Sequence, residues 1–214
     1  MGQERPKAEI IILGKPLFFY SLAAFENCAY VSRVVVVMHK SSIEFWSAER
    51  LRSMGFKKVT AVIKGGKTRQ ESVAKGLELA PEEGEVVIHD GARPLVTPEM
   101  VEAVCNIPKW AQGVVTAVEV TDTIKELREK EIVRTLNRSN LACAQTPQAF
   151  LVTALREGQR QALLDGFIGT DDASLIERIG GRILTVPGSR ENLKVTFKED
   201  IAVAEALLSK RGRP

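Results

Sequence analysis

The apolar residues of this chain gather in short blocks with two different spacings. Continuous apolar runs rich in β-branched residues predict strands that are buried on both faces, as in parallel sheets. Such runs lie at 33–38, 59–63, 86–88, 113–120, 182–186 and 193–197. Apolar residues spaced three and four apart predict helices. Segments with that spacing lie at 16–28, 41–55, 97–107, 149–164, 171–180 and 198–210, and a further helix is expected after the loop that starts at 64.

Strands and helices alternate along the chain, which predicts an α/β fold with a doubly wound, mainly parallel sheet. Residues 121–145 are different, because they lack a helical period and indicate short strands and turns. No internal repeat, low-complexity tract or linker divides the sequence. We therefore expect one domain over residues 1–214, with a protruding β-arm at about 121–145.

Composition narrows the range of partners. The 214 residues are 44% hydrophobic and carry a net charge of +3, with Lys and Arg scattered rather than clustered. That balance is typical of a globular protein, gives no indication of nucleic-acid binding, and suits small anionic ligands. No apolar run approaches the roughly 20 residues that span a bilayer. We therefore expect no membrane partner. Cys28, Cys105 and Cys143 form no CxxC pair, so we expect buried thiols and a cytoplasmic protein.

The first candidate for chemistry is the stretch EVVIHDGARPLV, residues 85–96. A predicted strand stops at Asp90 and Gly91, with Arg93 three residues after the aspartate. Ligands of open α/β sheets bind beyond the carboxyl ends of strands. The alternative is an Asp-Gly turn with solvated charges. His89 should point to the opposite sheet face from Asp90 and serve packing.

Two further stretches place polar groups at predicted strand ends or inside strands. Gly65 and Gly66, in KGGKTRQESV, follow a strand and allow a ligand to approach the backbone closely, although a plain turn explains them too. Lys194 lies within the predicted strand LKVTF, and a buried ammonium group requires an anionic partner. TPQAF at 146–150 and TDDAS at 170–174 are polar helix starts that suit either capping or ligand contacts.

Eight motifs together resemble the 2-C-methyl-D-erythritol 4-phosphate cytidylyltransferase family. In order they are PK (6–7), GKPL (14–17), GGxTRQxSV (65–73), HDGARP (89–94), TDT (121–123), TPQAF (146–150), TDDAS (170–174) and KVTFKED (194–200). The resemblance covers almost the whole chain. It implies a Rossmann-like fold and transfer of a cytidylyl group from CTP to a sugar-alcohol phosphate, with release of pyrophosphate, in non-mevalonate isoprenoid synthesis.

The resemblance also implies roles for individual residues. Asp90 matches the aspartate that helps to hold Mg²⁺, or another divalent cation, and Lys7 and Lys194 match catalytic lysines that neutralise the α-phosphate. The positions that cradle cytosine match Gly65, Gly66, Lys67 and Ser72. The positions that line the acceptor match Arg93, Thr123, Arg138, Thr146, Thr170 and Thr196. The arm at 121–145 matches a segment that swaps around a second subunit, which implies a homodimer.

Three alternatives stay open at the level of sequence. A ribitol-5-phosphate cytidylyltransferase would share much of the motif set. A dinucleotide-dependent oxidoreductase is less well supported, because no GxGxxG is present and His39 and Lys40 follow the first apolar strand where an acidic residue would bind ribose. A dimeric homologue that binds nucleotide without turnover is the third.

The beginning of the chain departs from the family pattern. The family starts with a strand and a loop of the form AAGxGxRMG, of which Met1 and Gly2 match only the tail. Roughly 20 residues would be needed for that strand and loop. We expect them to be missing here, leaving sheet neighbours unpaired and the triphosphate site incomplete. We accordingly expect a longer gene product to be the stable, active form; otherwise Arg5 and Lys7 would have to supply phosphate contacts.

Overall fold

The structure is a computed structural model that describes residues 6–212. Met1, Gly2 and Arg5, to which the expectations about the start of the chain refer, lie outside the described residues. The strands are β1 (Ile11–Ile12), β2 (Lys15–Pro16), β3 (Val34–Met38), β4 (Val59–Lys64), β5 (Glu85–Ile88), β6 (Gly113–Glu119), β7 (Lys125–Arg128), β8 (Glu131–Thr135), β9 (Ala142–Leu151) and β10 (Ile183–Pro187). The helices are α1 (Leu17–Asn27), α2 (Ala48–Ser53), α3 (Arg69–Leu77), α4 (Pro98–Val104), α5 (Val152–Asp165), α6 (Ala173–Arg178) and α7 (Lys198–Arg211), with one-turn helices η1 (Lys7–Glu9) and η2 (Arg138–Asn140).

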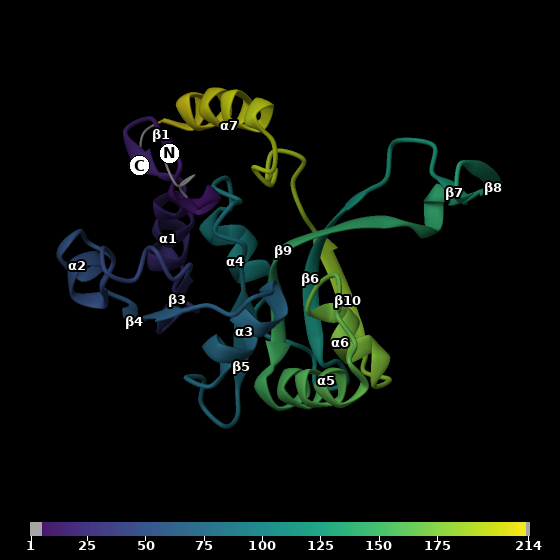
Figure 1. Cartoon of the computed structure of the whole chain (residues 1–214), viewed down its shortest axis with the longest axis horizontal. Helices are drawn as coiled ribbons and strands as arrows, with labels where there is room; N and C mark the ends of the chain where they lie inside the picture. Colours follow the sequence, from purple (N-terminus) through teal and green to yellow (C-terminus); the bar gives the residue numbers. More distant parts are fainter. Residues whose placement is uncertain (1–5, 213–214) are drawn as a thin grey trace.

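The fold is α/β, and its strands run mainly in one direction. The larger sheet has the strand order β10-β6-β9-β5 (Figure 1). β9 is antiparallel to both β5 and β6, whereas β10 is parallel to β6. β5, β6 and β10 therefore share one direction. β3 and β4 form a separate parallel pair.

Helices cover both faces of the sheets, as the doubly wound prediction requires. On one face α3, α5 and α6 pack around Phe150, which is fully buried. On the other face α1 and α4 pack against β5 through Phe25, Val101 and Val87. Successive β5 side chains alternate between these layers, since Val86 and Ile88 belong to the first cluster. A strand covered on both faces is apolar at every position, which explains the continuous runs in the sequence.

Side-chain caps fix where several helices begin. Thr97 accepts a hydrogen bond from the Met100 amide, and Pro98 occupies the first helical position of α4, as the sequence predicts. Thr68 caps α3 in the same way, by accepting from the Glu71 amide at 3.1 Å. This cap sets the position of Arg69, the first residue of α3.

Three sequence predictions of secondary structure were wrong. The helix expected at 41–55 is confined to α2, because Ser47 caps a helix that can start only after it. TPQAF lies in β9 rather than at a helix start, because Ala149 and Phe150 are fully buried in register with β5. The strand expected at 193–197 is absent from the described residues; Val195 makes one backbone bond, to Ala92 O at 2.8 Å, and packs beneath α7.

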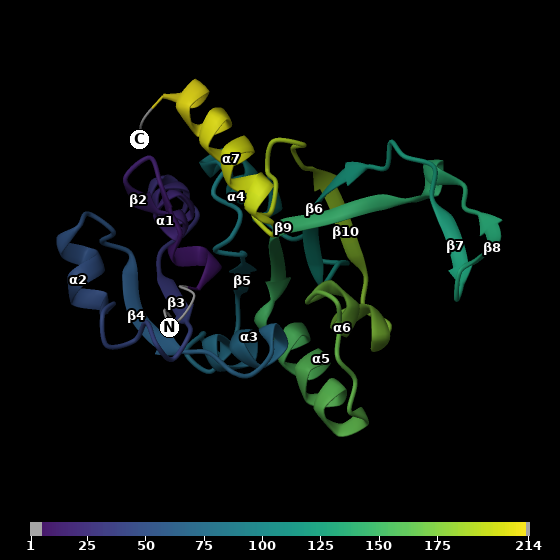
Figure 2. The ribbon, with the colours of Figure 1, turned by 45° about the horizontal axis from the view of Figure 1, so that its top comes forward.

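Residues 121–145 form the arm that the sequence predicts as short strands and turns. β7 and β8 pair as an antiparallel hairpin, and β9 begins at Ala142 on the way back to the sheet. The hairpin stands well away from the helical layers in both views (Figure 2). The hairpin of β7 and β8 therefore does not pack against the helical layers of its own chain.

The cysteines and the helices bear on two further expectations. All three thiols are free, but only Cys28 is buried; Cys105 is half-buried and Cys143, on the arm side of β9, is exposed, so the expectation of three buried thiols was wrong. Among the helices that the structure describes, each is too short or too polar to cross a bilayer.

Candidate functional site

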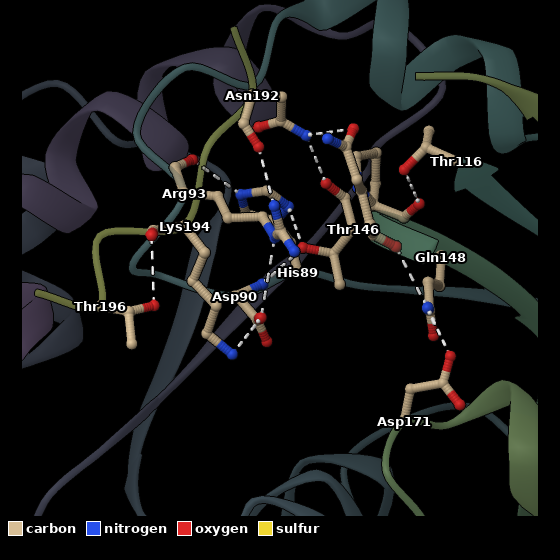
Figure 3. A network of polar contacts seen from close by, with 12 residues as sticks. His89, Asp90, Arg93, Thr116, Thr146, Gln148, Asp171, Asn192, Lys194 and Thr196 are labelled. Atoms are coloured by element: carbon tan, nitrogen blue, oxygen red, sulfur yellow. Dashed lines mark hydrogen bonds and ion pairs between the residues drawn. The ribbon is translucent and has the colours of Figure 1, made fainter. Parts of the chain in front are cut away.

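Asp90 lies just beyond the carboxyl end of β5 and is surrounded by cations. Its Oδ1 accepts a hydrogen bond from Arg69 Nε at 3.0 Å, and its Oδ2 lies 2.9 Å from Lys194 Nζ. Arg93 Nε is 3.8 Å from the same Oδ2. Figure 3 shows Lys194 and Arg93 converging on the aspartate from different segments of the chain. Asp90 is therefore part of a buried charge cluster and not a solvated turn.

Arg69 extends this cluster to a second carboxylate. Its Nη1 donates to Asp172 Oδ2 at 2.7 Å, and the Asp172 side chain is only 1% exposed. Asp172 Oδ1 is buried and has no hydrogen-bond partner within residues 6–212. In the sequence analysis Arg69 appears only within the stretch KGGKTRQESV, and Asp172 is not singled out. A buried Asp in the TDDAS motif, which must find a cation, was the available signal.

The cluster sets the ionisation of its two acids. Burial raises the pKa of Asp90, but the Arg69 and Lys194 charges outweigh it and hold that pKa at about 2. For Asp172 the effect of burial prevails over Arg69, so the pKa of this carboxyl is raised above its ordinary value. Asp90 is thus fully ionised near neutral pH. Arg69, Arg93 and Lys194 surround Asp90 with positive charge, which attracts anions to this part of the site.

Neutral groups joined by hydrogen bonds fix the backbone at Asp90. Thr146 Oγ1 accepts from the Asp90 amide at 3.1 Å and lies 3.0 Å from His89 Nδ1. His89 Nε2 is 3.1 Å from the Arg93 carbonyl oxygen, and the imidazole packs on Phe25 at 5.5 Å. Burial lowers the pKa of His89 to about 4. His89 is neutral and uses both ring nitrogens internally, so the packing role predicted for it is confirmed.

The segment after β10 reaches the cluster through a buried asparagine. Asn192 is 0% exposed. Its main-chain carbonyl oxygen accepts a hydrogen bond from Arg93 Nη1 at 2.8 Å, and its side-chain Nδ2 donates to the main-chain oxygen of Thr146 at 2.8 Å. These bonds place Lys194 two residues later beside Asp90. Lys194 is consequently positioned by an irregular segment and by Asn192, not by a strand. The ammonium group is not buried as the sequence analysis expects, because the segment runs along the surface and the side chain is 45% exposed, but it does have an anionic partner, Asp90.

Lys7 joins the edge of this arrangement. Its Nζ donates to the Thr196 carbonyl oxygen at 2.7 Å. The Thr196 amide in turn donates to Asp200 Oδ2 at 2.7 Å, at the start of α7. The one-turn helix η1 therefore meets the segment that leads into α7, close to Lys194.

Close approach of α3 explains why the loop after β4 contains Gly65 and Gly66. A Cβ atom at Gly66 would lie 2.2 Å from Glu71 Cβ, and one at Gly65 would lie 2.7 Å from Ser72 Oγ. The Gly66 amide donates to Ser72 Oγ at 3.0 Å, and the Lys67 amide donates to Glu71 Oε2 at 2.8 Å. The loop is folded tightly onto the first turn of α3. Ser72, Arg69 and Asp90 line one cavity of about 450 Å³.

The remaining predicted site residues do not join the cluster within this chain. Thr123 and Arg138 belong to the arm and are exposed, with Arg138 Nη1 donating to the Thr121 carbonyl oxygen at 2.5 Å. Thr170 is exposed just before α6. The structure thus brings together Asp90, Arg93, Thr146 and Lys194, with Lys7 and Thr196 alongside. Across residues 6–212 no group of three or more His, Cys, Asp or Glu side chains could hold a metal ion by itself.

Comparison with known proteins gives a consistent result. The family model described as 2-C-methyl-D-erythritol 4-phosphate cytidylyltransferase matches residues 1–210. A relative of that name from Bacillus licheniformis is 37% identical over 213 residues, covering 100% of this chain and 92% of its own length. Another, from Pelotomaculum thermopropionicum, is 39% identical and covers 99% of this chain and 90% of its own length.

Solved structures agree with the sequence comparisons. The crystal structure of 2-C-methyl-D-erythritol 4-phosphate cytidylyltransferase from Thermus thermophilus superimposes with a TM-score of 0.80 at 31% identity, covering 95% of this chain and 94% of that one. The 4-diphosphocytidyl-2C-methyl-D-erythritol synthase from Anaerococcus prevotii gives a TM-score of 0.84 at 26% identity, covering 97% and 92%. The α/β architecture and the family resemblance are both confirmed.

Proposed function

The chain belongs to the 2-C-methyl-D-erythritol 4-phosphate cytidylyltransferase family and is a nucleotidyltransferase, and we propose that it moves CMP from CTP to 2-C-methyl-D-erythritol 4-phosphate. One observation carries the assignment of the site: Arg69, Arg93 and Lys194, from three separate segments, converge on Asp90. A cationic cluster around one ionised acid suits a reaction between two phosphate groups.

The reaction needs little acid–base chemistry from the protein. The nucleophile is an oxygen of the acceptor phosphate, which is already anionic near pH 7 because its second pKa is about 6. It forms a bond to the α-phosphorus of CTP, while the bond from that phosphorus to the bridging oxygen breaks and its electron pair leaves with pyrophosphate. A general base is therefore unnecessary, in keeping with a neutral His89 whose two nitrogens are both engaged.

The cations of the cluster supply positioning and charge stabilisation. We assign Lys194 and Lys7 to the α-phosphate, where negative charge increases in the transition state. Lys194 is 45% exposed and bonded only to Asp90 among the contacts found for its ammonium group, so it can turn toward a ligand while Arg69 stays paired with Asp90. Lys7 donates to the carbonyl oxygen of Thr196, and an incoming phosphate oxygen can replace that acceptor.

Asp90 fits the way in which proteins bind a Mg²⁺–nucleotide complex. Mg²⁺ is commonly held by one or two carboxylates together with substrate phosphates, so a full protein cage is not required. The carboxylate is ionised at neutral pH, and each oxygen keeps a second lone pair beside its present cation. Bound there, a divalent cation would neutralise triphosphate charge. The residue that would hold it is Asp90.

Nucleotide recognition is assigned to the loop after β4. We propose that Gly65, Gly66, Lys67 and Ser72 cradle cytosine, since the loop is held in one shape by its own bonds to α3, and Ser72 of that helix lines the same cavity as Asp90. The acceptor is assigned to Arg93, Thr123, Arg138, Thr146, Thr170 and Thr196.

The position of the arm supports a homodimer. Thr123 and Arg138 cannot contribute to the cluster of their own chain, because the arm extends away from it (Figure 1). The hairpin also exposes Leu127, Ile132 and Val133, which are 57%, 58% and 49% exposed. Apolar side chains on a protruding hairpin indicate a protein contact. We propose that the arm packs on a second copy of the chain and presents its polar residues to that copy's acceptor site.

Free thiols fit a cytoplasmic location.

An acceptor comparison tests the proposed activity. The purified chain is given CTP and Mg²⁺ with either 2-C-methyl-D-erythritol 4-phosphate or ribitol 5-phosphate, and pyrophosphate release is recorded. We expect the higher kcat/KM with 2-C-methyl-D-erythritol 4-phosphate. A higher value with ribitol 5-phosphate would reject this acceptor, and release without any acceptor would reject the transfer reaction.

A further inference from the structure

The side chain of Gln145 forms a reciprocal pair with the backbone just after β10. Its Nε2 donates to the Ser189 carbonyl oxygen at 2.9 Å, and the Ser189 amide donates back to Gln145 Oε1 at 3.3 Å. One side chain thus bonds both backbone groups of a residue, as a neighbouring strand would. Gln145 is 8% exposed, so the pair is largely shielded from water.

The residue before Ser189 is a glycine because of this pair. A Cβ atom at Gly188 would lie 2.6 Å from Gln145 Oε1 and 3.2 Å from the Ala117 carbonyl oxygen. The Gly188 amide donates to the same Ala117 oxygen at 2.7 Å, next to the last residue of β10. Gln145 therefore holds the chain at the point where it leaves the sheet.

The segment that follows Ser189 leads to Lys194 and is bonded to β9 a second time. Asn192 Nδ2 donates to the main-chain oxygen of Thr146 at 2.8 Å and lies 3.5 Å from Gln145 Oε1. Asn192 and Lys194 lie on the same segment, beside the charge cluster (Figure 3). Two consecutive residues of β9 thus fix the path of the chain before it reaches Lys194.

Two further side-chain contacts of this segment lie at the surface. Arg190 is exposed and donates to a carbonyl oxygen of β6 at 3.2 Å, and Glu191, 45% exposed, pairs with Arg211 at 2.6 Å. Exposed pairs contribute little to stability, whereas a buried polar group that loses its partner also lacks water. The buried bonds of Gln145 and Asn192 are therefore the ones whose loss should move the segment.

We propose that Gln145 is a positioning residue for the transfer reaction: by bonding the backbone of Ser189, it directs the segment that places Lys194 at the α-phosphate. This inference rests on the proposed function, in which Lys194 stabilises the charge that develops on that phosphate. The Gln145 amide is engaged at both its oxygen and its nitrogen, so it acts through Lys194 and not on a substrate. A catalytic group misplaced by about 1 Å can lose about 10²-fold in rate.

Hydrogen exchange followed by mass spectrometry tests the structural half of the proposal. Gln145→Met keeps the length of the side chain and removes both of its hydrogen bonds to Ser189. The matched control is Gln112→Met, because Gln112 Oε1 accepts from the Arg182 amide at 2.7 Å, just before β10. We expect Gln145→Met to speed exchange in 189–194 by about tenfold or more and Gln112→Met to leave that segment unchanged.

Steady-state kinetics tests the functional half. We expect Gln145→Met to lower kcat by about 10- to 100-fold with little change in the KM for CTP, because Lys194 acts on charge that increases in the transition state. Gln112→Met should keep the parent kcat. Gly188→Ala breaks the same bonds without replacing Gln145, since its Cβ displaces the amide, and should lower kcat in the same way.

A double-mutant cycle separates positioning of Lys194 from a general structural role. In a Lys194→Ala background, Gln145→Met should change kcat by less than about twofold, because no ammonium group remains to be misplaced. An equal fold loss in both backgrounds would overturn the proposal, as would unchanged exchange in 189–194. A parent chain without turnover would reject the proposed function instead, and the exchange comparison would still decide whether Gln145 holds the segment.

Discussion

The guanidinium group of Arg69 lies against the carboxylate of Asp90, with Nε 3.0 Å from Oδ1. The other end of the same group holds Asp172, at 2.7 Å. One residue at the start of α3 thus connects the strand end that carries the predicted metal ligand with the segment before α6. Removing one partner from such a buried arrangement leaves charge without compensation.

Arg69→Ala should lower the free energy of unfolding by about 3 kcal/mol, the lower end of the range for breaking a buried ion pair, because Arg69 itself is 33% exposed. Denaturant unfolding monitored by circular dichroism measures the change. The matched control is Arg52→Ala, which breaks the surface pair with Glu49 and one hydrogen bond to the Val59 carbonyl oxygen and should cost clearly less. Similar losses in the two variants would contradict a buried role for Arg69.

The contribution of His89 to stability should rise with pH between about 4 and 6.5, whereas the raised pKa of Asp172 acts in the opposite direction. The folded pKa of His89 is about 4, below the ordinary value near 6.5, so the unfolded chain binds more protons in that interval. The contribution is complete above pH 6.5, is lost as the pH falls toward 4, and amounts to at most about 3 kcal/mol.

Histidine substitutions identify the residue responsible. We expect His89→Gln to flatten the profile of unfolding free energy from pH 4 to 6.5, and His39→Gln, at an exposed position, to leave its shape unchanged. Asp90 behaves differently: its pKa of about 2 keeps its contribution intact down to about pH 4. An unaltered slope in His89→Gln would show that another group titrates.

The arm should control assembly. Replacing Leu127, Ile132 and Val133 together with serine removes the exposed apolar side chains of the hairpin without touching the sheets. We expect sedimentation velocity to show a dimer for the parent chain and a monomer for the variant. The variant should also have a raised KM for the acceptor and an unchanged KM for CTP, because only acceptor residues lie on the arm. A parent chain that sediments as a monomer at micromolar concentration would refute this role.

Divalent metal should be essential for turnover. Excess chelator should abolish pyrophosphate release, and Mg²⁺ should restore it, because Asp90 is the only carboxylate of the cluster with appreciable exposure, 14% against 1% for Asp172. Full activity in excess chelator would show that turnover does not require a divalent metal.

Local patterns predicted much of this fold because the strands are apolar on both faces. The runs around Val36 and Val87 identified β3 and β5, and the charged residues after β5 identified the site. LKVTF has the same local pattern as a strand, but its neighbour offers only the Ala92 carbonyl, so no ladder forms. The pairing of Arg69 with Asp172 is a contact between distant segments, which spacing along the chain cannot reveal.

Transfer of labelled CMP tests the central claim most directly. The chain is incubated with CTP labelled at the α-phosphate, Mg²⁺ and 2-C-methyl-D-erythritol 4-phosphate, beside Asp90→Asn and Arg52→Ala. We predict label in the product together with pyrophosphate, a rate about 10²- to 10³-fold lower in Asp90→Asn, and an unchanged rate in Arg52→Ala. The account is contradicted if the folded parent chain transfers no label, or if Asp90→Asn transfers it at the parent rate.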